Sequence, residues 1–224
     1  YNITNKNILV INRGINTKFF NQPINEKQKI DFFRKFEIDY TKKIVLFPAR
    51  LTAWKGQSQF LDIIEKITTK NVLFLFVGDT KNVNYTKFIR SKIRKLNLMN
   101  SCSILGNLNQ NDMRLLYHIA DLSLSLPLRA EGFGRIISES LYSGTPVLAF
   151  DYGGVKNQLE HMSDFFKSKP HDYKNLPEKI DLLINLTKEQ KIKILQDAKS
   201  VIENHFSKKN MVHKYMKLYE SLQI

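Results

Sequence analysis

Residues 72–78 read Val-Leu-Phe-Leu-Phe-Val-Gly, an unbroken run of six apolar side chains that ends at a glycine. A run without alternation is typical of a strand that is buried on both faces. The segments on each side of it, 58–67 and 85–96, carry apolar residues at helical spacing. A buried strand between two amphipathic helices indicates a βαβ unit, in which helices join parallel strands.

The same alternation continues along the chain. Short apolar runs predict further strands at residues 8–11, 44–47, 103–105, 122–126 and 147–150. Helical spacing predicts further helices at residues 26–36, 110–119 and 136–142. The order of these elements predicts an α/β fold, namely a doubly wound parallel sheet with helices on both faces.

The last fifty or so residues have a different, purely helical character. Ser207 is a candidate N-cap for a final helix, in which Met211, Tyr215, Leu218 and Leu222 share one face. We therefore expect one doubly wound α/β domain that is followed by C-terminal helices at residues 177–224.

The content of charged residues, Cys and His limits which classes of ligand and partner the chain can bind. The chain has 224 residues, with 35 Lys or Arg and 21 Asp or Glu, so its formal net charge is +14. The basic residues are scattered, without blocks of like charge, which argues against nucleic acid. Two explanations of the charge stay open: a codon bias that also enriches Asn and Ile, and attraction to phosphate on nucleotides or lipid headgroups. The single cysteine, Cys102, excludes a disulfide within the chain, and the His residues lack metal-ligand spacing, so we expect no metal site.

Residues 129–139, Arg-Ala-Glu-Gly-Phe-Gly-Arg-Ile-Ile-Ser-Glu, carry the densest group of functional side chains. Glu131 precedes two glycines, where the backbone can approach a ligand closely. These glycines lead into a predicted helix, whose free N–H groups and positive dipole end suit phosphate. Glu139 lies on that helix, where a carboxylate can accept hydrogen bonds from the two hydroxyls of a ribose. The alternative is a surface loop with an ordinary exposed Glu.

Residues 48–56, Pro-Ala-Arg-Leu-Thr-Ala-Trp-Lys-Gly, form a second candidate segment. It follows a predicted buried strand and precedes a helix, so Arg50 and Lys55 lie at the carboxyl edge of the sheet, where α/β proteins bind ligands. Two fixed cations at this edge can neutralise a leaving diphosphate. The alternative is that both are solvated surface charges.

Taken together, these segments resemble the C-terminal, donor-binding domain of a GT-B glycosyltransferase of family GT4, the glycosyl transferases group 1. The resemblance covers most of the chain. It rests on the segments at residues 11–19, 50–56, 76–79, 131–139, 144–147 and 153–154. In the first of these, Arg13 stands where the family usually has Asn, which we associate with enzymes of bacterial envelope polysaccharides. The resemblance implies that residues 1–20 form an interdomain entry segment with the first strand. It also implies that residues 21–176 form a Rossmann-like, nucleotide-sugar-binding domain, which the helices at 177–224 follow.

The resemblance also implies roles for individual residues. Arg50 and Lys55 would bind the diphosphate and stabilise its developing charge, and Glu131 would contact hydroxyls of the donor sugar. The backbone amides of Gly132, Phe133 and Gly134 would face the sugar and diphosphate. Glu139 would hold the ribose, whereas Gly106 and Leu108 would line the base pocket.

The activity implied is a retaining, metal-independent transfer of a sugar from a nucleotide diphosphate sugar to a glycan or lipid-linked acceptor, in lipopolysaccharide or capsule synthesis. No cofactor is expected, since the nucleotide sugar is the donor substrate. We expect a cytoplasmic protein that contacts the inner face of a membrane peripherally. We expect this chain to lack the family's N-terminal acceptor domain and to be inactive alone. Two alternatives stay open: a nucleotide-sugar-binding module, and a UDP-sugar epimerase of the same architecture.

Overall fold

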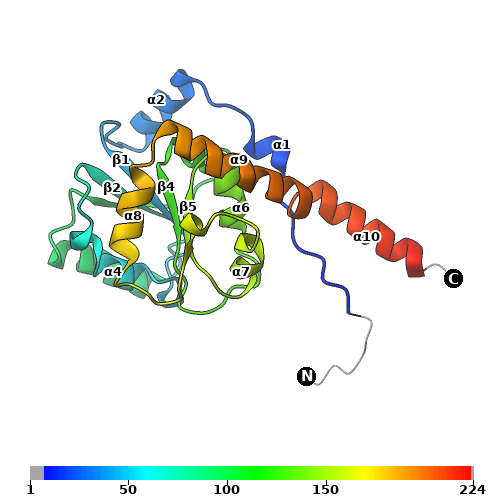
Figure 1. Ribbon diagram of the computed structural model, residues 1–224. Helices are drawn as coiled ribbons and strands as arrows, with labels where there is room; N and C mark the ends of the chain where they lie inside the picture. The colour runs from blue at the N-terminus through cyan, green and yellow to red at the C-terminus, as the bar shows by residue number, and fades with distance from the viewer. Residues whose placement is uncertain (1–7, 223–224) are drawn as a thin grey trace.

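A computed structural model describes residues 8–222, and a six-stranded parallel sheet forms the centre of the protein (Figure 1). Its order is β3-β2-β1-β4-β5-β6, so the chain winds outward from β1 in one direction and then from β4 in the other. The strands are β1 Lys43–Pro48, β2 Val72–Val77, β3 Cys102–Gly106, β4 Leu122–Ser125, β5 Val147–Phe150 and β6 Lys167–Ser168. This topology confirms the predicted doubly wound α/β fold.

Alternate side chains of each central strand enter two separate hydrophobic cores. Along β1, Ile44 and Leu46 pack in the first core, whereas Val45 and Phe47 pack in the second. All four are buried. Burial on both faces explains why these strands are continuously apolar.

Helices cover both faces of the sheet. The first core is closed by α1 Thr17–Phe20, α2 Glu26–Lys35, α5 Gln110–Ile119, α6 Arg135–Tyr142, α7 Gly154–Leu159 and α9 Lys188–His205. The second core is closed by α3 Gln57–Leu61, α4 Val83–Lys95 and α8 Leu176–Ile184. Three single-turn 3₁₀ helices, η1 Ala53–Lys55, η2 Ile64–Lys66 and η3 Asp164–Phe166, complete the connections.

Two predicted elements differ from the structure. The strand expected at residues 8–11 is wrong, because this segment has no regular structure and Ile8, Leu9 and Val10 are largely exposed, without a neighbouring strand. The single helix expected at 58–67 is divided into α3 and η2. The division occurs because the N–H of Ile63 bonds to the carbonyl of Phe60, three residues before it, in the 3₁₀ pattern and not in the α-helical pattern. The apolar residues of that segment still enter the second core.

The predicted C-terminal helices are present, and two of them complete the domain. Residues of α8 and α9 belong to the second and first cores, respectively. The last helix, α10 Lys208–Leu222, projects from the body of the protein, and the structure buries none of its side chains (Figure 1). Ser207 accepts a hydrogen bond from the backbone N–H of Asn210 at 3.2 Å, as expected of an N-cap. Among residues 8–222, no helix combines the length and hydropathy needed to cross a membrane.

The segment before α1 is fixed to the junction of α9 and α10. Ile15 donates to the carbonyl of Phe206 at 2.8 Å and accepts from the N–H of Lys208 at 2.7 Å. Gly14 leaves no room for a side chain, because a Cβ there would lie 2.3 Å from the carbonyl oxygen of Ser207. Residues near the beginning and the end of the described chain are therefore side by side.

Candidate functional site

The sheet places the candidate site where the winding reverses, between β1 and β4. These strands are neighbours, with Val45 opposite Leu122 and Leu46 opposite Ser123. The chain leaves β1 toward β2 and leaves β4 toward β5, so the connections diverge at the carboxyl ends of the two strands. This is the position at which open α/β sheets form their ligand-binding crevice. The loop that carries Arg50 and Lys55 follows β1, and the loop that carries Glu131 follows β4.

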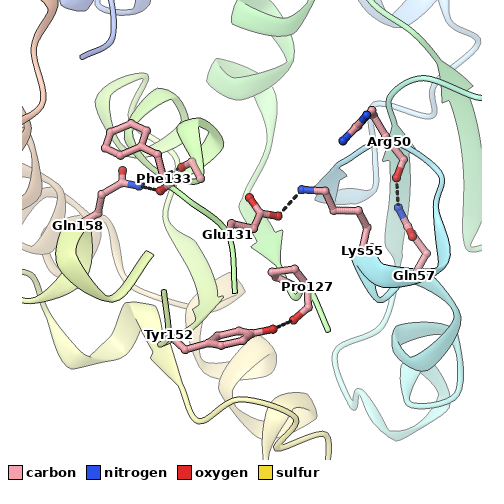
Figure 2. A network of polar contacts seen from close by, with 9 residues as sticks. Arg50, Lys55, Gln57, Pro127, Glu131, Phe133, Tyr152 and Gln158 are labelled. Atoms are coloured by element: carbon pink, nitrogen blue, oxygen red, sulfur yellow. Dashed lines mark hydrogen bonds and ion pairs between the residues drawn. The ribbon is translucent and has the colours of Figure 1, made fainter. Parts of the chain in front are cut away.

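Lys55 and Glu131 meet across this crevice. The Lys55 ammonium forms an ion pair with Oε1 of Glu131 (Figure 2), and the two side chains are only 16% and 13% exposed. The ammonium also lies 4.2 Å from the ring centre of Trp54. A partly buried ion pair of this kind fixes both groups at the end of the sheet, although its desolvation limits what it contributes to stability.

Backbone contacts hold the two loops at this spacing. The N–H of Leu128 donates to the carbonyl of Trp54 at 2.7 Å. Gly56 adopts a left-handed conformation with φ of 85°, and a Cβ there would lie 2.1 Å from the carbonyl oxygen of Leu126. Only glycine allows both the conformation and the close approach. The position of Lys55 is therefore set by the fold as well as by its ion pair.

Arg50 lies on the same loop, with an exposed side chain and a fixed backbone. The amide of Gln57 donates to the Arg50 carbonyl at 2.9 Å (Figure 2). Gln57 is fully buried, and the Tyr85 hydroxyl donates to its Oε1 at 3.4 Å. The N–H of Leu51 bonds to the carbonyl of Asp79 after β2, at 2.9 Å. The guanidinium is thus presented from an anchored loop.

The glycine loop, residues 132–134, follows Glu131 and is held in place by hydrogen bonds to α7. Gln158, which is fully buried, donates to the carbonyls of Phe133 and of Gly134, the latter at 3.2 Å (Figure 2). The N–H of Gly154 bonds to the Glu131 carbonyl at 2.7 Å. A Cβ on Gly154 would lie 2.0 Å from the Gly132 carbonyl oxygen, so this packing requires glycine. The carbonyls of the loop are consequently turned away from the crevice.

The other side of the glycine loop is open. A Cβ on Gly132 would meet no atom within 4 Å, and Gly134, with φ of 75°, is the N-cap of α6. The first N–H groups of a helix have no partner within it and carry its positive dipole end. An open hollow of about 460 Å³ lies beside the loop, lined by residues 10–13 and 132–135. Arg13 and Arg135 give this hollow a positive border.

Glu139 lies on α6 and has two partners. Arg135 donates to Oε1 at 2.8 Å, and the hydroxyl of Tyr117 on α5 donates to Oε2 at 3.3 Å. The Glu139 side chain is 13% exposed. Burial raises the pKa of the Glu139 carboxyl, although Arg135 and the Tyr117 hydroxyl act in the opposite direction.

Gly106 is the last residue of β3 and Leu108 follows it, and β3 is separated from β1 by β2. Gly106 has φ of 75°, and its carbonyl accepts from the N–H of Gly78 at 2.8 Å. A Cβ on Gly106 would meet nothing within 4 Å, and Leu108 packs partly against the first core. These two residues share the carboxyl edge of the sheet with the Lys55–Glu131 pair, but they lie two strands away from it.

Four residues that support the site were not predicted from the sequence: Gln57, Gln158, Tyr117 and Arg135. Gln57 and Gln158 are polar residues with no exposed surface, and a single sequence does not distinguish them from surface glutamines. Arg135 lies four residues before Glu139, a helical spacing at which opposite charges pair, so this contact was detectable. Over residues 8–222, no group of three or more His, Cys, Asp or Glu side chains is arranged to hold a metal ion.

Most of the chain matches one known protein family. The profile of the family described as "Glycosyl transferases group 1" matches residues 28–200. This chain belongs to that family. Its fold confirms the expected class, the Rossmann-like half of a GT-B architecture. The chain spans about half the length of the curated relatives it matches.

Individual glycosyltransferases agree with this assignment. A Campylobacter jejuni N,N'-diacetylbacillosaminyl-diphospho-undecaprenol alpha-1,3-N-acetylgalactosaminyltransferase is 26% identical over 219 residues, which cover 96% of this chain and 54% of the relative. A glycosyltransferase structure from Rickettsia africae superposes with a TM-score of 0.88 at 28% identity, covering 95% of this chain and 56% of that one. The structure of Anabaena HepE in complex with UDP and glucose has a TM-score of 0.79 at 24% identity, covering 93% of this chain and 55% of HepE, and shares its fold.

The environment of Glu139 in this glycosyltransferase domain predicts a pH-dependent stability. Because burial raises the pKa of Glu139 above its ordinary value of 4.5, the folded state binds this proton more tightly than the unfolded chain. Proton binding to Glu139 therefore favours the folded state. The free energy of unfolding decreases as the pH rises above 4.5 and the carboxyl loses its proton. We expect Glu139→Gln to be more stable than the natural protein at pH 7, with an advantage that disappears near pH 4.

Urea denaturation between pH 4 and pH 8 measures this difference. Glu203→Gln is a matched control, because Glu203 accepts a hydrogen bond at 2.7 Å from Tyr142 on the same helix α6 but is exposed. The control should show no gain at pH 7. An advantage of Glu139→Gln that is the same at pH 4 and pH 7 would contradict a role for the Glu139 charge.

Proposed function

We propose that this domain binds the nucleotide sugar of a retaining glycosyltransferase, which transfers the sugar to a glycan or lipid-linked acceptor. The observation that carries the proposal is the Lys55–Glu131 pair at the reversal of the sheet, beside an open glycine loop at a helix N-terminus. A cation, a carboxylate and free amides are the groups that a sugar diphosphate needs. Membership of the glycosyl transferases group 1 supports a transferase over the epimerase alternative.

The proposed mechanism assigns one task to each group. The bond between sugar and diphosphate breaks heterolytically, through a state that resembles an oxocarbenium ion. Arg50 and Lys55 neutralise the leaving diphosphate, and the N-terminus of α6 with the Gly132–Gly134 amides adds to that stabilisation. Because cationic side chains take this task, the proposed reaction needs no metal and no cofactor besides the donor substrate.

Glu131 has two tasks in this proposal. Its Oε1 holds Lys55 in the crevice, and its Oε2 accepts a hydrogen bond from a hydroxyl of the sugar. The same carboxylate thereby fixes the position of the sugar relative to the cation that receives the leaving group. Glu139 takes the ribose, and Gly106 and Leu108, at the end of β3, line the base pocket.

The acceptor class is proposed from the relatives. The Campylobacter jejuni relative is named as a transferase acting on a lipid diphosphate, and a Salmonella typhimurium relative, 22% identical over 181 residues, as a lipopolysaccharide 1,2-N-acetylglucosaminetransferase. These names support bacterial envelope polysaccharide synthesis, in lipopolysaccharide or capsule, as the setting. Because the chain spans about half of such relatives, we propose that the acceptor is bound elsewhere and that residues 1–224 alone bind the nucleotide without transfer.

The first test is a thermal-shift panel of UDP, GDP, ADP and CDP with residues 1–224. A ligand that binds only the folded state raises the melting temperature. At a ligand concentration of 100 Kd, it adds about 2.7 kcal/mol to the free energy of unfolding. We expect at least one nucleotide to stabilise the domain, and UDP is the first candidate because Anabaena HepE, which shares the fold, holds UDP. The absence of a shift with all four would contradict the proposal, as would sugar transfer by residues 1–224.

Mutation of the two cations tests the mechanism in the active enzyme that contains this chain. Loss of a contact that strengthens as the bond breaks lowers kcat more than it raises KM. We expect Lys55→Ala and Arg50→Ala each to lower kcat by about 10²-fold or more. Arg50→Lys should restore only part of the rate, because an ammonium cannot form the paired hydrogen bonds of a guanidinium.

The exposed Lys70, which precedes β2 at the opposite, amino edge of the sheet, supplies a matched control. Lys70→Ala should leave kcat within about twofold, as expected of a surface charge outside the site. A kcat at the level of the natural enzyme in either Arg50→Ala or Lys55→Ala would remove that residue from the proposed mechanism.

We also propose a cytoplasmic protein that contacts the inner face of a membrane peripherally. The net charge of +14 supports attraction to anionic lipid, at about 1 kcal/mol for each Lys or Arg near the surface. Sedimentation with vesicles should then increase with the fraction of phosphatidylserine and decrease with salt. Equal sedimentation with purely neutral vesicles would contradict an electrostatic contact.

A further inference from the structure

The Glu139 carboxylate has two hydrogen-bond partners, one buried and one exposed. Tyr117 reaches it from α5 with a side chain that has no exposed surface, and its hydroxyl lies 3.3 Å from Oε2. Arg135 reaches it from the first residue of α6 with a side chain that is 54% exposed, and its guanidinium lies 2.8 Å from Oε1. One partner is part of the core, and the other is part of the surface.

Tyr117 is fixed on several sides. Its ring packs against Phe20, with centroids 6.2 Å apart, and its backbone carbonyl accepts a hydrogen bond from the buried Thr145 hydroxyl. A side chain in a close-packed interior has no alternative position available without opening the core. Burial and the neighbouring Glu139 charge raise the pKa of Tyr117 well above its ordinary value, so the hydroxyl keeps its proton and remains a donor.

Arg135 is not fixed in this way. Its side chain is 54% exposed, so water can solvate the guanidinium when it leaves Oε1. Arg135 also borders the open hollow beside the glycine loop, so its guanidinium has solvent and space on that side. A neutral hydroxyl that approaches Oε1 competes with a partner that is easily displaced.

We propose that Tyr117 is a positioning residue that aims Glu139 at the ribose diol, and that Arg135 occupies Oε1 only until a ribose hydroxyl replaces it. This inference rests on the proposed function, because it takes a nucleoside diphosphate as the ligand. Tyr117 keeps its bond to Oε2 in both states. The orientation of the carboxylate is thus the same before and after binding, and only the exposed partner changes.

The experiment measures ribose recognition separately from overall affinity. Residues 1–224 are titrated with UDP and with 2′,3′-dideoxy-UDP, and with the GDP and ADP pairs in parallel, by isothermal calorimetry. The ratio of the two dissociation constants reports only the contribution of the diol, because both nucleotides bind the same folded fraction. A change in stability alone leaves this ratio unaltered.

Four variants decide between the roles. We expect Glu139→Ala to abolish the preference for the ribose form, and Tyr117→Phe to reduce the ratio about 2- to 10-fold, the effect of one hydrogen bond. Arg135→Met should leave the ratio unchanged or increase it, since the competing partner is gone. Tyr142→Phe is the matched control, because its hydroxyl bonds to Glu203 from the same helix α6, and it should keep the ratio of the natural protein.

The outcomes distinguish this inference from the proposed function. If the natural protein binds none of the nucleotides, the proposed function is wrong, and the inference fails with it. If binding is present and Glu139→Ala discriminates like the natural protein, Glu139 is not the ribose ligand and the inference is overturned. A natural ratio in Tyr117→Phe would overturn the positioning role, and a loss in Arg135→Met as large as in Tyr117→Phe would overturn the exchange.

Discussion

The adjacency of β1 and β4 is the constraint on which the site depends. Because these parallel strands are neighbours and their connections diverge, the residues after Pro48 and after Ser125 are brought to one crevice although about 76 positions separate Lys55 from Glu131. The ion pair between them, the bond from Leu128 to Trp54 and the obligatory glycine at position 56 all follow from that adjacency. The remaining elements serve to hold the two strands at this spacing.

Much of the fold could be predicted because continuously apolar strands leave an unambiguous signal. The strand at 72–77 and the helices predicted at 85–96, 110–119 and 136–142 have nearly the observed limits, whereas α7 was not predicted. The strand at residues 8–11 was predicted on the same signal and is wrong, because an apolar run does not reveal whether a neighbouring strand exists to pair with it. The division of 58–67 into two short helices was hidden for a related reason, since both conformations send the same apolar residues into the core.

The location of the candidate residues within the fold was predictable, but their mutual contacts were not. Sequence spacing placed Lys55 and Glu131 at one sheet edge without indicating that they pair directly. Gln57 and Gln158 support the two loops through bonds to backbone carbonyls, and such contacts leave no pattern in side-chain chemistry along the chain. Physical reasoning from a sequence thus locates groups at the ends of strands, whereas the packed interior behind them determines how those groups are oriented.

The junction of α9 and α10 has a consequence for how the domain opens. Ile15 is hydrogen-bonded to Phe206 and Lys208, and the ring of Phe206 lies 5.8 Å from that of Phe133 in the glycine loop. Local unfolding proceeds in cooperative units that share such contacts. We therefore expect the segment before α1, the end of α9 and the loop beside Glu131 to open as one such unit. Amide protons of Ile15 and Phe206 should exchange with solvent at rates that follow each other, and fraying of the C-terminal helices would reach the glycine loop before it reached the strands of the sheet.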